Sequence, residues 1–139
     1  MTYYATGQVP APIDQVFGVL TDPARMPEWL PGCDRAVTQG FVGQGARIQA
    51  RFAGSRMTEF EVVDYAPPHR FGWVERGQRN GWRLWFRLNA TGGATAVTIC
   101  EVWAPTSLAA WVWGKLVRRR HAQRQVGLIL ENLQAIIVS

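Results

Sequence analysis

The chain has 139 residues, a length that suits one domain able to bury a core without disulfide or metal support. Its net charge of +5 would suit nucleic acid or anionic membranes, but the sequence has no nucleic-acid-binding motif, and residues 118–124 do not present one basic helical face. No apolar run approaches the roughly 20 residues of a membrane span, and no signal-peptide pattern opens the chain. We therefore expect a cytoplasmic protein with neither integral membrane association nor a nucleic-acid partner.

The first elements are predicted to be a strand and two short helices. Residues 3–9 alternate as a strand does, and residues 13–20 carry apolar side chains at helical spacing. Asp22 and Pro23 then supply a cap and a helix-compatible proline for a second short helix, which ends at residues 31–32.

From there to residue 103, apolar residues recur at every second position, as in a strand. Glycine and proline turn signals divide this segment into about six antiparallel strands. One face of these strands is apolar and the other is polar. The last strand places Glu101 on the apolar face. The other predicted members of that face are Ile48, Ala50, Phe52, Phe60, Val62, Trp82, Leu84, Phe86, Leu88, Val97, Ile99 and Trp103.

One long helix is predicted over residues 105–138, because Pro105 closes the last strand and no proline follows. Such a helix would be about 45 Å long. Its buried stripe also contains Ala122, Lys115 and Arg119, so the middle of that face is small or charged, which predicts a polar group or a cavity beneath it. The apolar members of the stripe are Leu108, Val112, Val126, Leu130, Leu133 and Ile137.

This order of elements predicts an α+β fold. A curved antiparallel sheet of about six or seven strands would bury its apolar face against the long C-terminal helix, as a single domain over residues 1–139.

Three stretches of the chain resemble the START-like helix-grip superfamily (SRPBCC), in particular its polyketide cyclase/dehydrase-like group. They are APIDQVFGVLTDPARMPEWLPGC at residues 11–33, VVDYAPPHRFGW at 62–73 and GGATAVTI at 92–99. The resemblance implies a deep apolar cavity between sheet and helix, used in the superfamily for lipids, sterols, polyketides and hormones. It also implies that Trp29 closes one end of that cavity. Members include carriers, sensors, cyclases and aromatases, so the fold does not fix the function.

No cofactor and no metal site are expected. Cys33 and Cys100 lie far apart without metal-type spacing, which also favours a reducing compartment. His69 and His121 lie in no metal-like spacing, and the ligands of a Rieske-type centre are absent from the sequence. His69 follows two prolines and is predicted to be an exposed turn residue.

Glu101, with Arg119 or Lys115 as its partner, is the candidate polar end of a ligand site. A buried carboxylate can accept a hydrogen bond from a ligand, or move a proton if burial raises its pKa. A structural ion pair that closes one end of the core explains the same residues.

Large aromatic residues on one concave face form the candidate cavity wall, although a solid aromatic core would use the same residues. The candidate ligand-binding residues are Trp29, Phe52, Phe60, Trp73, Trp82, Phe86, Glu101, Trp103, Lys115, Arg119 and Val126.

The sequence favours reversible binding or transport of a hydrophobic small molecule. The alternative is a polyketide cyclase or dehydratase that uses the same cavity, although no nucleophile motif is present and no catalytic residue can be assigned. A third interpretation is a docking protein, because Trp113 lies opposite the core stripe and is expected to be exposed, which favours a homodimer contact.

Overall fold

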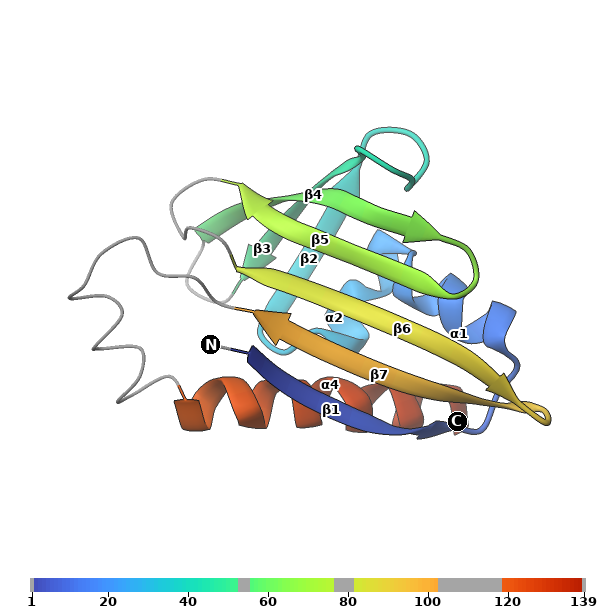
Figure 1. The fold of residues 1–139 in the computed structure, drawn as a ribbon. Coiled ribbons are helices and arrows are strands. Elements are labelled where there is room, and N and C mark those ends of the chain that lie inside the picture. The colour runs from blue at the N-terminus through green and yellow to red at the C-terminus, as the bar shows by residue number, and fades with distance from the viewer. Residues whose placement is uncertain (1, 53–55, 77–81, 103–118, 139) are drawn as a thin grey trace.

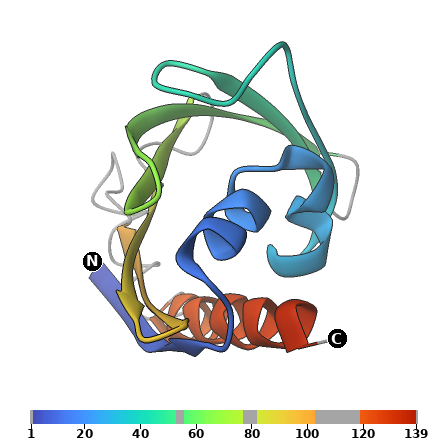
Figure 2. The same ribbon diagram turned by 90° about the vertical axis from the view of Figure 1, so that its right-hand side faces the viewer.

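In the computed structural model, seven antiparallel strands form one sheet that curls around two short helices, with a longer helix across its open side (Figures 1 and 2). The structure describes residues 2–52, 56–76, 82–102 and 119–138. The strand order is β1-β7-β6-β5-β4-β3-β2, so β1 lies at one edge beside β7. The strands are β1 (Thr2–Val9), β2 (Cys33–Thr38), β3 (Arg47–Phe52), β4 (Arg56–Ala66), β5 (Arg70–Arg76), β6 (Arg83–Thr91) and β7 (Ala94–Val102).

The predicted short helices are confirmed. Helix α1 spans Ile13–Leu20, and a 3-10 turn, η1 (Pro23–Arg25), leads into α2 (Met26–Trp29). The side chain of Asp22 accepts a hydrogen bond from the backbone N–H of Ala24, as the predicted cap requires. Figure 2 shows both helices inside the curl of the sheet, and Trp29 at the end of α2 is fully buried.

The turns follow the sequence signals. Gly92 and Gly93, both with positive φ, close the tight turn between β6 and β7, a conformation that glycine adopts without steric cost. Between β4 and β5 the peptide bond joining Pro67 and Pro68 is cis. His69 lies at this turn and is exposed, as predicted.

Helix α4 (Arg119–Val138) crosses the edge of the sheet at β1. Gln134 donates a hydrogen bond to the backbone oxygen of Gln8 (2.8 Å). A Cβ at Gly7 would lie 2.8 Å from Leu130, so the glycine allows helix and strand to approach closely. The predicted start of the long helix, over residues 105–118, lies outside the described residues.

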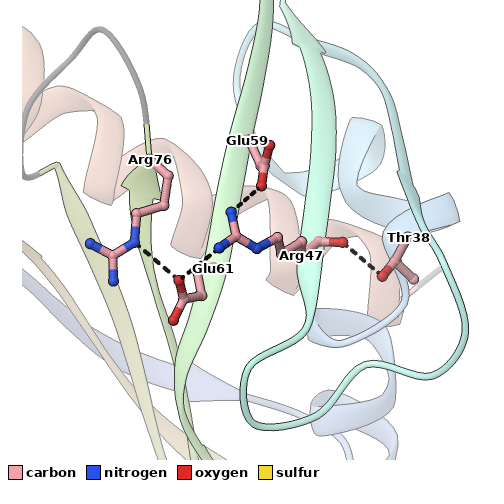
Figure 3. A network of polar contacts seen from close by, with 5 residues as sticks. All are labelled: Thr38, Arg47, Glu59, Glu61 and Arg76. Carbon is pink, nitrogen blue, oxygen red and sulfur yellow. Dashed lines mark hydrogen bonds and ion pairs between the residues drawn. The ribbon is translucent and has the colours of Figure 1, made fainter.

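The inner face of the sheet is apolar and the outer face polar, as the alternation predicted. On the outer face, Arg47 pairs with Glu59 and lies 3.7 Å from Glu61, which also pairs with Arg76 at 3.1 Å (Figure 3). This Arg47–Glu61 network spans β3, β4 and β5.

Trp85 is a large apolar residue on the outer face. Its ring lies over Gly72 of β5, where a Cβ would come within 2.6 Å of it, and the guanidinium of Arg83 lies 5.9 Å from its ring centroid. Trp85 is therefore half-buried on the outer face without entering the core.

Candidate functional site

Aromatic residues from four elements meet on the inner face of the sheet. Trp73 of β5 lies at their centre, with Phe60 of β4 stacked 4.9 Å away and Trp29 of α2 stacked 5.9 Å away. Phe86 of β6 packs against Trp29 edge-to-face at 5.4 Å. The rings thus join α2 to the middle of the sheet.

Two further rings extend this arrangement along Phe60. Phe52 of β3 lies 6.2 Å from it, and Trp82, just before β6, lies 5.4 Å from it. The structure therefore brings together six of the seven aromatic residues predicted to line a cavity, and the seventh, Trp103, lies outside the described residues. We call these six the aromatic cluster: Trp29, Phe52, Phe60, Trp73, Trp82 and Phe86.

A polar end adjoins the cluster at Trp82. The indole N–H of Trp82 donates a hydrogen bond to Oε1 of Glu101 at 2.5 Å. Glu101 is only 5% exposed and lies on the inner face of β7, as the alternation predicted. A carboxyl oxygen at this depth needs a hydrogen-bond donor, which Trp82 supplies.

The sequence proposed Arg119 or Lys115 as the partner of Glu101. Lys115 and the side chain of Arg119 lie outside the described part of the structure. The first turn of α4 lies at the same end of the sheet as the end of β7 (Figure 1). The pairing of Glu101 with Arg119 or Lys115, as a ligand anchor or as a structural ion pair, therefore stays a prediction. The hydrogen bond between Glu101 and Trp82 was not predicted.

Glu75 is a second inner-face carboxylate that the sequence analysis missed. It is buried near the end of β5, and its backbone N–H donates to the backbone oxygen of Trp82 (2.9 Å). The signal was available, because Phe71, Trp73 and Glu75 alternate along one strand. Two buried carboxylates consequently lie at the Trp82 end of the sheet.

Helix α4 covers the other end of the cluster. Val126, a predicted site residue, is fully buried together with Leu133. Asn132 donates a hydrogen bond to the backbone oxygen of Trp29 (3.2 Å), which ties α4 to α2. Ile129, absent from the predicted stripe, is also fully buried, whereas Leu130 is half-buried over β1.

The two cysteines are free thiols, as their spacing suggested. Burial raises the pKa of Cys33, and burial also raises the pKa of Cys100, partly opposed by its hydrogen bond with Tyr4. Among the residues that the structure describes, no three His, Cys, Asp or Glu side chains form a group that could hold a metal ion.

Comparison with known proteins identifies the family. A family model described as "Polyketide cyclase / dehydrase and lipid transport" matches residues 2–136. A search of curated proteins finds no match. Over the described helices, none combines the length and apolar character needed to cross a membrane.

Solved structures share the fold at low sequence identity. The Aha1 dimer of Colwellia psychrerythraea is 18% identical, with a TM-score of 0.73 over 99% of this chain and 96% of that one. The protein TTHA0849 of Thermus thermophilus is 13% identical, with a TM-score of 0.78 over 99% and 97%.

DynU16, from the dynemicin biosynthetic locus, is 18% identical, with a TM-score of 0.73 over 99% of this chain but 47% of its own. These likenesses confirm the helix-grip fold. The family model, which matches nearly the whole chain, shows that this protein belongs to the polyketide cyclase/dehydrase and lipid transport family.

Proposed function

We propose that the chain binds a hydrophobic small molecule reversibly at the aromatic cluster. The observation that carries the proposal is the continuity of the cluster, which runs from the Trp82–Glu101 hydrogen bond to Trp29 beneath α4. Aromatic walls with a few placed polar groups are typical of small-molecule sites. The family description, which includes lipid transport, supports the same ligand class.

A cyclase or dehydratase would need more than the aromatic cluster, because it requires a group that moves a proton during the reaction. Glu101 and Glu75 are the buried carboxylates available to do so. Reversible binding requires neither carboxyl group to change protonation. It therefore needs no catalytic group among the described residues. We prefer binding on this ground.

The test is a titration with N-phenyl-1-naphthylamine, an apolar fluorescent probe, followed by native mass spectrometry of the complex. We expect saturable binding of one probe per chain. Trp82→Leu, which shortens the cluster at its polar end, should weaken binding. Trp85→Leu removes an indole from the outer face and is the matched control, which should bind as the wild type does. Absence of saturable binding, or equal loss in both variants, would contradict the proposal.

A further inference from the structure

Two indole N–H groups are enclosed within the aromatic cluster. Trp29 and Trp73 are both 0% exposed, and neither Nε1 atom has a hydrogen-bond partner within the described part of the chain. Their rings stack 5.9 Å apart at an interplanar angle of 28°. Trp82, the third indole of the cluster, donates instead to Glu101.

A buried donor without an acceptor costs free energy comparable to a lost hydrogen bond. Buried tryptophans therefore usually place the N–H against an acceptor. Phenylalanine would supply apolar surface at either position without this cost. Two such donors in one stack suit an acceptor that a ligand brings, since the described residues provide none.

Neighbouring rings replace that acceptor poorly. Phe86 packs edge-to-face on Trp29, and Phe71 packs edge-to-face on Trp73 at 5.5 Å. An N–H group directed at an aromatic face forms only a weak hydrogen bond. A trapped water molecule would need two to four polar partners. The backbone oxygen of Trp29 accepts a hydrogen bond from Asn132, which leaves one of its two lone pairs for such a water.

We infer that the indole N–H groups of Trp29 and Trp73 are the hydrogen-bond donors of the ligand site, and that they select apolar ligands carrying an uncharged acceptor oxygen, such as a ketone, ester or quinone. This inference rests on the proposed function and names the ligand class. An indole nitrogen can only donate, so the ligand must accept.

A neutral acceptor fits better than an anion. An anion buried without a positive partner is costly, and the buried acidic or basic side chains of the described residues are the carboxyl groups of Glu75 and Glu101, which supply no positive charge. A carbonyl oxygen carries two lone pairs, so it can accept hydrogen bonds without bringing a charge into the cluster.

A matched pair of probes tests the inference: 2-acetylnaphthalene carries a carbonyl, and 2-isopropylnaphthalene has nearly the same shape without it. Each competes with N-phenyl-1-naphthylamine for the wild-type protein. We expect both to bind, with the ketone at least about fivefold tighter despite its greater solubility in water.

The indole ¹H–¹⁵N resonances report the same event in the wild-type protein. The Trp29 and Trp73 peaks, assigned from Trp29→Phe and Trp73→Phe, should move downfield with the ketone and not with the hydrocarbon. In these variants the ketone should lose its advantage while the hydrocarbon still binds. Trp85→Phe is the control and should keep the advantage.

The outcomes separate the two proposals. Equal affinity of the two probes with no downfield movement would overturn the inference and leave hydrophobic binding intact. The inference would also be overturned if the indole protons showed contact with a long-lived bound water and their peaks did not respond to the ketone. The same holds if the peaks were shifted upfield by an aromatic face and did not respond. Failure of both probes and of N-phenyl-1-naphthylamine to bind would remove the proposed function and the inference with it.

Discussion

The indole N–H of Trp82 donates to Oε1 of Glu101, joining the residue before β6 to the inner face of β7. This hydrogen bond holds a buried carboxylate against the edge of the aromatic cluster. Since a buried donor or acceptor left without its partner is costly, we expect the pair to contribute to stability as well as to the shape of the site.

A double-mutant cycle with Trp82→Phe and Glu101→Leu should give a coupling free energy of about 1–3 kcal/mol in urea unfolding. Glu101→Gln keeps a carbonyl acceptor for the indole and should cost less than Glu101→Leu. Strictly additive effects of the two substitutions would show that the hydrogen bond does not stabilise the folded state.

Gly72→Ala should destabilise the sheet by about 1–3 kcal/mol, because the new methyl group would meet the ring of Trp85 at 2.6 Å. Thermal or urea unfolding measures the change. Combining it with Trp85→Leu should remove most of the loss, since the obstructing ring is gone.

Gly18→Ala in α1 is the control for that substitution. Nothing lies within 4 Å of the position that its Cβ would occupy, and alanine favours helix, so stability should rise by about 0.5–1 kcal/mol. A loss at Gly18 similar to that at Gly72 would contradict the steric explanation.

Glu61→Gln should cost little stability, and the cost should shrink as salt is added. Glu61 lies 3.1 Å from Arg76 and 3.7 Å from Arg47, but both arginine side chains are more than half exposed (Figure 3). Solvent and salt screen such pairs strongly. Urea unfolding in low and high sodium chloride measures this, and a large loss that salt leaves unchanged would contradict it.

The raised pKa values of Cys33 and Cys100 predict slow alkylation of both thiols in the folded protein. Raising the thiol pKa favours the protonated form, so thiolate reactivity should begin above the ordinary cysteine pKa of 9.0. The linked stability should likewise fall as the pH rises past that value. Iodoacetamide rates from pH 7 to 10, with Cys33→Ala and Cys100→Ala separating the thiols, test this. Rapid reaction of Cys33 at neutral pH would contradict it.

The fold was predictable because the spacing of apolar residues, the turn residues and the prolines indicate the same helices, strands and boundaries along the chain. Alternation alone put Phe60, Phe86 and Glu101 on one face. It could not pair Trp82 with Glu101, because that contact depends on the register and side-chain directions of separate strands. Nor could it reveal that Gly72 makes room for Trp85, since the two residues meet only when β5 and β6 pair. Helical spacing likewise located Val126 and Leu133 but missed Ile129, whose burial depends on how α4 is rotated over the sheet.

Intermolecular nuclear Overhauser effects between bound N-phenyl-1-naphthylamine and the protein test the central claim most directly. The account predicts contacts from the probe to Phe60 and to the indole protons of Trp29 and Trp73. Contacts confined to Trp85 on the outer face would contradict it, because they would place the ligand outside the aromatic cluster.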